Sequence, residues 1–352
     1  MKIFFKHIIF LGLGLILSLK LIAQDIHFSQ FYANPLQQNP AMAGAVYGME
    51  GSILYKDQWR AIGSPYKTFA ASYDVRFEQR RNRNGYLAGG LNFFSDVAGD
   101  SKMGSTNANI SLAYLARLSK YHRLGGGLQL GYLQRKVEYN GLQWGSQFDG
   151  LNYDPSLPNG EQNFGPNSVG KFDMGLGLSW VYNNTGGDIR VTDNHDLNFS
   201  AGVGLFHLTK PNIAFNSVED RLPMRFVAHA NGVISIQSTK LAVVPGFLYQ
   251  RQGKQQELYI GSLFRYLITQ DSKYTGLKNA SAFYWGAYIR ARDALTLKIR
   301  YEYAGWGIGL SYDINTSSLK AGTYARGGLE IALVYTAPNP FIKTYGANHS
   351  RY

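Results

Sequence analysis

Residues that could bind a metal or react are scattered along this chain of 352 residues. The seven histidines show no metal-ligand spacing; they are His7, His27, His122, His195, His207, His229 and His349. His207 and His229 flank a loop expected at 209–223 and could meet as a zinc pair, although ordinary polar strand positions explain them better. The chain has no cysteine, which excludes disulfides, thiolate metal sites and thiol catalysis. We expect no metal and no cofactor.

Two patterns resemble catalytic motifs without meeting their requirements. Residues 125–131 read GGGLQLG, but they lie in a strand pattern with no helix after them, so they are expected to be strand glycines packed in a lumen rather than a phosphate loop. Ser200 and His207 are seven residues apart and face opposite ways on one strand, so only cross-strand pairs remain open. We expect no enzyme activity, with an outer-membrane lipase as a distant alternative.

The elements that must position these residues are strands. Apolar and polar residues alternate for about ten residues, a turn follows, and the pattern repeats. For example, Phe69, Tyr73 and Phe77 share one face of a strand, whereas Asp74 and Arg76 share the other. Fourteen such segments are expected, at 46–57, 67–77, 86–96, 106–119, 123–136, 171–182, 196–208, 224–236, 241–251, 256–267, 281–291, 294–303, 305–313 and 327–336.

The composition decides what these strands face. Apolar residues make up 45% and charged residues only 16%, against about 25% charge in ordinary soluble domains. Tyrosine and tryptophan recur at strand ends, where an aromatic girdle would lie, and small residues share the polar faces with the charges. The sequence therefore predicts an all-β, transmembrane outer-membrane barrel of about 14 antiparallel strands. A secreted soluble sandwich is the alternative.

The first 23 residues have the pattern of a cleavable signal peptide. Lys2 and Lys6 precede an apolar run, and a small residue ends the segment, so cleavage is expected between Ala23 and Gln24. Cleavage would remove three lysines and no acidic residue, which lowers the net charge from +12 to +9. For an exported chain, we expect the basic surplus to face the anionic lipid of the outer membrane rather than nucleic acid.

The expected domains are a signal peptide (1–23), a short non-helical periplasmic or lumenal segment (24–45), the barrel (46–336) and a C-terminal tail (337–352). That segment 24–45 plugs the barrel is a hypothesis. An even number of strands places both barrel ends on one side, taken as the periplasm. The long gaps at 137–170, 209–223 and 314–326 then become extracellular.

The loop at 137–170 holds aromatic residues among Gly, Pro, Asn and Asp, and two interpretations of it are equally good. The rings could anchor a protein partner, or they could fold back on the barrel mouth as a self-packed loop. The run 80–85 (RRNRNG) reads as a solvated tight turn, with a periplasmic docking patch as the lesser alternative. The candidate partner-binding residues of the extracellular loops are Trp144, Phe148, Tyr153, Phe164 and Phe215.

The start of the expected mature chain carries a specific motif, formed by His27, Phe28, Ser29, Gln30, Tyr32, Asn34, Pro35, Asn39, Pro40 and Gly44. It closely resembles the opening of the PorP/SprF family of type IX secretion and gliding-motility outer-membrane proteins. The likeness continues at residues 207–229, 245–250, 288–294, 306–313 and 327–331, and covers essentially the whole mature chain. The loop at 137–170 and the tail after Pro340 match nothing in the family.

The resemblance implies a non-enzymatic role in the outer membrane of a Gram-negative bacterium. Family members are similar to barrels that bind the C-terminal sorting domain of a large secreted, adhesin-like protein, support its export and anchor it on the cell surface. Type IX secretion components and some periplasmic lipoproteins are further implied partners. The rival class is a diffusion channel or small-molecule transporter, since fourteen strands leave room for a lumen.

Overall fold

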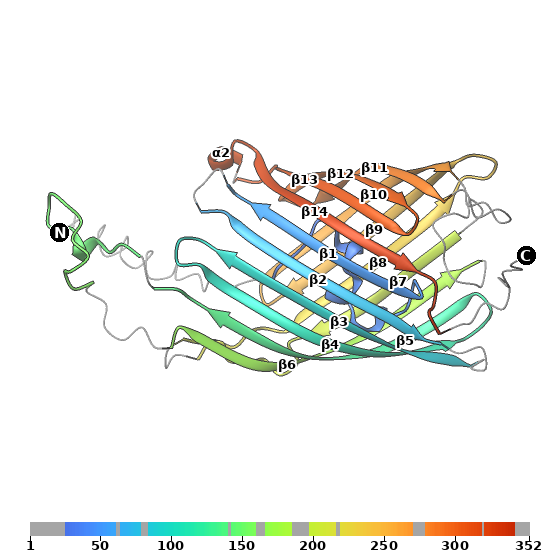
Figure 1. The fold of residues 1–352 in the computed structure, drawn as a ribbon, viewed down its shortest axis with the longest axis horizontal. Helices are drawn as coiled ribbons and strands as arrows, with labels where there is room; N and C mark the ends of the chain where they lie inside the picture. The colour runs from blue at the N-terminus through green and yellow to red at the C-terminus, as the bar shows by residue number, and fades with distance from the viewer. Residues whose placement is uncertain are drawn as a thin grey trace, which may run out of the picture.

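The computed structural model describes residues 25–60, 64–78, 84–139, 142–159, 166–184, 197–215, 219–269, 279–318 and 320–341. Within these ranges, fourteen tilted antiparallel strands form one closed barrel, in which β1 pairs with both β2 and β14 (Figure 1). The strands are β1 (Met49–Gln58), β2 (Tyr66–Phe77), β3 (Gly85–Ala98), β4 (Met103–Arg117), β5 (His122–Lys136), β6 (Ser168–Asn183), β7 (Leu197–Phe206), β8 (Arg225–Ser235), β9 (Leu241–Gln252), β10 (Gln255–Thr269), β11 (Ser281–Arg290), β12 (Ala294–Tyr303), β13 (Trp306–Asn315) and β14 (Arg326–Ala337). The predicted barrel is confirmed.

The two faces of the barrel follow the alternation of the sequence. In β2, Phe69, Tyr73 and Phe77 are exposed on the outside, whereas Asp74 and Arg76 are buried in the lumen. The same division holds along the other strands, so the outer surface is apolar and aromatic and the inner surface carries the polar groups. Among the described residues, no helix is long and apolar enough to cross a membrane.

Strand ends are where the structure departs most from the predicted ranges. β6 begins at Ser168 rather than at 171, because residues 168–170 continue the ladder with the polar end of β5, at residues 134–136. β1 begins at Met49 rather than at 46, because residues 45–48 still belong to the chain inside the barrel. Gly48 permits this turn into β1, since a Cβ there would lie 2.1 Å from the backbone N of Asn339.

Residues 25–48, which we call the plug, lie inside the barrel. They contain three short 3-10 helices, η1 (Phe31–Ala33), η2 (Pro35–Gln37) and η3 (Pro40–Met42). The two Asn-Pro pairs explain the last two: the Asn34 and Asn39 side chains accept hydrogen bonds from Gln37 N and Ala41 N, and each following proline sits at the first helical position, where no N–H is needed.

The hydrophobic core is the interface between the plug and the barrel wall. Phe31 packs with residues of β7 to β11, Leu36 and Met42 with β3 to β6, and Phe28 with β1 to β3 and β14. The plug therefore contributes to three of the buried apolar clusters, each on a different sector of the wall. Of the two locations that the sequence left open for this segment, the structure shows the lumenal one.

Candidate functional site

The plug runs from one end of the barrel to the other. Odd-numbered strands end at what we call the loop end, which carries the long connections after β5 and β7; even-numbered strands end at the opposite end. The Asp25 carboxylate accepts a hydrogen bond from His207 Nε2 at 2.6 Å, just beyond the end of β7. Gly44 N donates to Asp74 Oδ2 at 2.7 Å, near the end of β2. The first described residue therefore lies at the loop end.

A cluster of charged groups holds the start of the plug. His207 Nδ1 donates to Asp173 at 2.6 Å, and its Nε2 donates to Asp25. Arg225 Nε lies 3.3 Å from the same Asp25 oxygen, and Gln252 Nε2 donates to the other oxygen at 3.2 Å. One of the five side chains comes from the plug and four from the wall: Asp173 lies within β6, His207 follows β7, Arg225 begins β8 and Gln252 ends β9. The cluster therefore joins the two ends of the β7–β8 connection to the plug.

At neutral pH His207 is protonated and Asp25 is ionised. Burial disfavours the charged form of His207, but the Asp25 charge and the hydrogen bonds to Asp173 and Asp25 outweigh it and raise the pKa of His207 to about 9. Burial raises the pKa of Asp25, whereas His207 and Arg225 lower it by more, so the pKa of Asp25 lies below its ordinary value of 3.8. The raised histidine pKa stabilises the fold below pH 6.5 and this is lost as pH rises through 9; the lowered aspartate pKa stabilises it above 3.8. The cluster therefore stabilises the fold most between pH 3.8 and 6.5.

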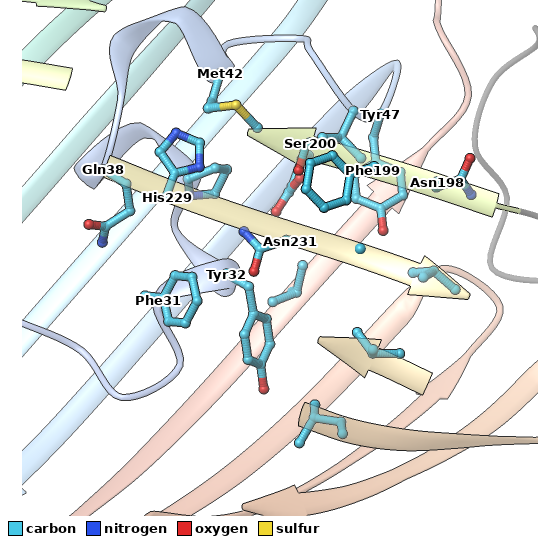
Figure 2. Close-up of a pocket in the computed structure, with 18 of the residues that line it drawn as sticks. Phe31, Tyr32, Gln38, Met42, Tyr47, Asn198, Phe199, Ser200, His229 and Asn231 are labelled. Atoms are coloured by element: carbon cyan, nitrogen blue, oxygen red, sulfur yellow. The ribbon is translucent and has the colours of Figure 1, made fainter. Parts of the chain in front are cut away.

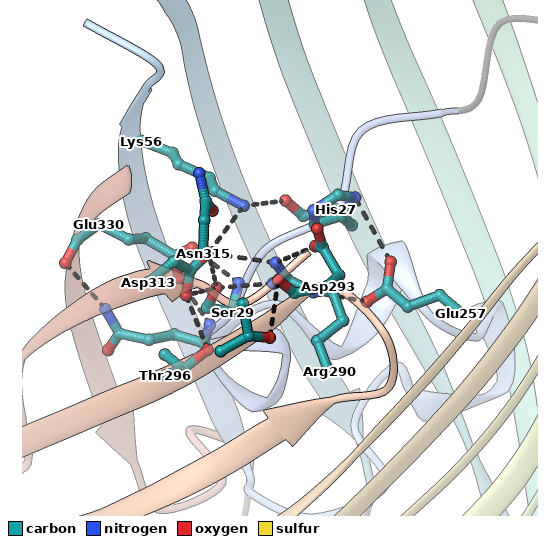
Figure 3. Close-up of polar contacts among 12 residues, drawn as sticks. His27, Ser29, Lys56, Glu257, Arg290, Asp293, Thr296, Asp313, Asn315 and Glu330 are labelled. Carbon is teal, nitrogen blue, oxygen red and sulfur yellow. Dashed lines mark hydrogen bonds and ion pairs between the residues drawn. The ribbon is translucent and has the colours of Figure 1, made fainter. Parts of the chain in front are cut away.

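Deeper in the lumen, Glu330 of β14 binds two successive backbone N–H groups of the plug. Its carboxylate accepts from Ser29 N at 2.7 Å and from Gln30 N at 2.6 Å (Figure 3). On the other side, Lys298 Nζ of β12 donates to the Ser29 carbonyl and lies 3.6 Å from the centroid of the Tyr288 ring. A carboxylate and an ammonium thus bind the same peptide unit in opposite senses, which fixes its position and direction.

A second set of charges holds the Ser29 and His27 region from β1, β11 and β13. The Ser29 hydroxyl donates to Asp313 at 2.8 Å and accepts from Arg290 Nη2 at 2.9 Å (Figure 3). Arg290 also pairs with Asp313 at 3.2 Å, and Lys56 Nζ donates to the His27 carbonyl at 2.9 Å. These charges are buried and paired, so removing one partner would leave an uncompensated charge at a cost of about 3–5 kcal/mol.

Glycines of the wall make room for the plug backbone. Gly127 of β5 faces Ala41, and a Cβ there would lie 2.5 Å from Ala41 N and 2.6 Å from Ala41 Cα. The neighbouring strand fixes the same residues, since Ser179 Oγ donates to the Ala41 carbonyl at 2.9 Å and Asn39 Nδ2 donates to the Leu178 carbonyl at 2.8 Å. The run 125–131 thus consists of strand residues in β5, as predicted, and its lumenal glycines Gly125 and Gly127 receive the plug.

A cavity of about 150 Å³ remains between the plug and the wall in the half nearer the opposite end. Phe31, Tyr32 and Met42 of the plug and Phe199 and Asn231 of the wall line it (Figure 2). A cavity of this size holds a few water molecules, and polar groups such as the Asn231 amide are available to bind them.

The candidate partner residues of the long loops lie at the loop end. Phe148 is 55% exposed and pairs with Tyr153 in a small antiparallel bridge. The Tyr153 hydroxyl donates to the buried Gln147 side chain at 3.1 Å, so residues 142–159 form a compact turn of their own, which stands beyond the strand ends in Figure 1. Trp144 belongs to this turn and is half-buried. Phe215 is half-buried, with the Arg135 guanidinium 6.0 Å from its ring centroid.

The motif at the start of the mature chain is the plug itself. Ser29, Gln30, Asn34, Asn39 and Gly44 all contact the wall through hydrogen bonds, and Phe28 and Pro40 are buried. The predicted cleavage site at Ala23 and Gln24, residue Phe164, most of the run 80–85 and the end of the tail lie outside the described residues.

The two histidines considered as a zinc pair bind different parts of the plug. His207 bonds to Asp25, whereas His229 Nε2 lies 3.1 Å from the Asn39 amide nitrogen. Ser200 lines the cavity, and no hydrogen bond is found between it and His207 among the described residues. Lys56, Glu330 and Asp313 of the wall, which bind the plug, were not predicted as functional residues; the available signal was a charged residue on the inward face of a strand.

A closed barrel with an apolar outer face, aromatic strand ends and a polar interior defines a bacterial outer-membrane β-barrel protein. Residues 21–335 match the family model described as type IX secretion system membrane protein PorP/SprF. The chain therefore belongs to this family and is located in the outer membrane, and both predictions from the sequence are confirmed.

Among curated proteins no sequence matches the chain. Among solved structures, it is similar to BamA from Haemophilus ducreyi lacking POTRA domains 1–3, at 9% identity over 83% of this chain and 70% of that one, with a TM-score of 0.41. It is also similar to the CymD monoaromatic hydrocarbon channel, at 13% identity over 87% of this chain and 93% of that one, with a TM-score of 0.43. Both comparisons concern the strand arrangement alone.

Proposed function

We propose that the protein is a non-catalytic receptor of the type IX secretion system. Its loop end would bind the C-terminal sorting domain of a large secreted, adhesin-like protein, support the export of that protein and hold it at the cell surface. Membership of the family supports the secretion role. The opposite end, where β1 begins and β14 ends, would face the periplasm, where other secretion components and lipoproteins are available as partners.

The observation that carries this proposal is the occupied lumen. Segments of the plug are bound to the wall by Glu330, Lys298 and Arg290, and its apolar residues form the core. A protein built in this way presents its ends, rather than its interior, to other molecules. At the loop end, Phe148 and Leu151 are 55% and 86% exposed, and such apolar side chains are the kind that bury on binding a protein.

The second candidate function is a diffusion channel, and the plug argues against it. A channel of this width would need water along the lumen, whereas side chains of Ser29, Gln30, Asn34 and Asn39 are buried there. Steady current through the intact protein in a planar bilayer would support the channel. Absence of current with the same amount of protein in the bilayer would support the receptor proposal.

The receptor proposal is tested by surface display. Removing the protein from its own bacterium should abolish display of one or a few large surface proteins while other type IX cargo still leaves the cell. Restoring it with Phe148→Ala and Leu151→Ala should recover roughly a tenth or less of that display, because each ring or branched chain lost from an interface centre costs about 1–2 kcal/mol.

The matched control replaces one leucine and one aromatic residue by alanine at the opposite end, as Leu118→Ala and Tyr121→Ala. Both residues are exposed in the turn between β4 and β5, so these changes should leave display unchanged. Normal display of every large surface protein without the barrel would defeat the proposal. Equal losses from the two pairs of substitutions would remove the loop end as the binding site.

A further inference from the structure

Exposed basic residues with few acidic neighbours line one half of the loop end, whereas cations of the other half, such as Lys102 and Arg221, pair with Glu138 and Glu219. Four connections meet there: the short β9–β10 (253–254) and β11–β12 (291–293), and the longer β13–β14 (316–325) and β1–β2 (59–65), of which residues 319 and 61–63 lie outside the described part of the chain. These strands are neighbours around the barrel, so the connections form a continuous arc. The exposed cations of the arc, which we call the basic arc, are Arg60, Lys67, Arg251, Lys254, Arg292, Lys320 and Arg326.

Few acidic groups balance the basic arc. The four connections contain one acidic residue, Asp293, and it pairs with the buried Arg290 at 3.2 Å. Arg60 pairs with Asp57 at 2.5 Å, and Asp57 is also the cross-strand neighbour of Lys67, so this carboxylate offsets one charge of the arc. For Lys254 and Arg292, no ion pair is found within the part of the chain that the structure describes. The arc thus carries a net positive charge that the protein itself does not neutralise.

The height of the arc relative to the membrane follows from the aromatic residues beside it. Trp59 and Tyr66 pack edge to face at 4.9 Å at the loop end of β1 and β2, and Tyr249 packs against Phe226 near the loop end of β9 and β8. Such rings lie at the level of the lipid headgroups. Because the connections at Lys254 and Arg292 are only two and three residues long, their charges stay close to that level.

We propose that the basic arc binds the phosphate groups of lipid A in the outer leaflet. The proposal rests on the orientation given under the proposed function, in which the loop end faces the outside, and it does not depend on the sorting domain. Guanidinium groups bind phosphate through two parallel hydrogen bonds, and lysine ammonium groups bind it as point charges. Lipid A would then surround the half of the rim that carries the basic arc, leaving the long loops over β5 to β8 for protein contacts.

The test measures lipid retention by the intact purified protein. Detergent-solubilised protein is mixed with bis-phosphorylated lipid A or with its dephosphorylated form, and bound lipid is counted by native mass spectrometry. Lys254→Gln with Arg292→Gln should weaken binding of the phosphorylated form about 25-fold, since each cation near an anionic surface contributes roughly fivefold. The dephosphorylated form should bind weakly to every variant, and added salt should reduce the difference.

The matched control removes two exposed lysines from the opposite end, as Lys120→Gln and Lys240→Gln, and should leave lipid A binding unchanged. Heat-modified electrophoretic mobility of both variants shows that the barrel is folded. Equal retention of lipid A by the two variants would overturn the proposal. The proposal would also be overturned if Lys254→Gln with Arg292→Gln lost cargo display but still bound lipid A, because the basic arc would then bind an acidic protein surface instead. Loss of lipid binding with normal display supports it and leaves the receptor proposal standing.

Discussion

Deleting residues 26–40 is expected to turn a silent barrel into an ion-conducting pore. This stretch contains Phe28, Phe31 and Leu36, which are at most 1% exposed, together with the lumenal amides of Asn34 and Asn39. Without it, a fourteen-stranded wall with a polar inner face would fill with water. The charges that now bind the plug would be hydrated instead, so the barrel can persist.

The measurement is single-channel recording in planar bilayers, with the unaltered protein as the reference. The deletion should also lower thermal stability, because burial of each large apolar side chain contributes about 1.5–3 kcal/mol. Unchanged conductance together with unchanged stability would show that the segment does not occupy the lumen.

Gly127→Leu is expected to displace the plug without removing it. A side chain at this position would meet Ala41 N at 2.5 Å and Ala41 Cα at 2.6 Å, and these backbone atoms cannot move without the plug. Overpacking of this kind costs about 1–3 kcal/mol, and here part of that cost is relieved by moving the plug out of place. We therefore expect intermittent current and a lower melting temperature.

The neighbouring glycine supplies the control. Gly126 points to the outside, and the nearest atom to a Cβ there is Leu178 Cδ2 at 4.0 Å, so Gly126→Leu should stay silent in the bilayer and fold normally. The two variants share composition, strand and mass, and differ only in the face that carries the leucine. Equal behaviour of the two would contradict the close contact between β5 and the plug.

The barrel could be predicted from the sequence because its signal is periodic and repeated. Rows such as Phe69, Tyr73 and Phe77 alternate with charged or small residues, and alternation gives strand type and sidedness together. Strand ends were less predictable, because polar residues can continue a hydrogen-bonded ladder without any change in hydropathy. β6 shows this at Ser168.

The plug could be predicted from the sequence only in part. Asn34-Pro35 and Asn39-Pro40 indicated an ordered, non-helical segment; the segment is ordered, but each pair caps a three-residue 3-10 helix. Neither its lumenal position nor its direction could be read locally, because both depend on contacts more than 200 residues apart, such as Ser29 with Glu330. The alternation of apolar and polar residues predicted which charged side chains point into the lumen. It could not predict which group of the plug each of them binds.

The most direct test of the plugged barrel is thiol cross-linking between plug and wall in the native membrane. Asn34 Nδ2 donates to Asn92 Oδ1 at 3.0 Å, and the chain has no cysteine of its own, so Asn34→Cys with Asn92→Cys introduces a single possible pair of thiols. Because the two side chains meet at their tips, a short bifunctional thiol reagent followed by peptide mapping should recover the 34–92 link in most of the protein, whereas Asn34→Cys with the outward-facing Phe93→Cys should give none. Absence of the 34–92 link in a folded barrel, or equal linking to position 93, would contradict the account.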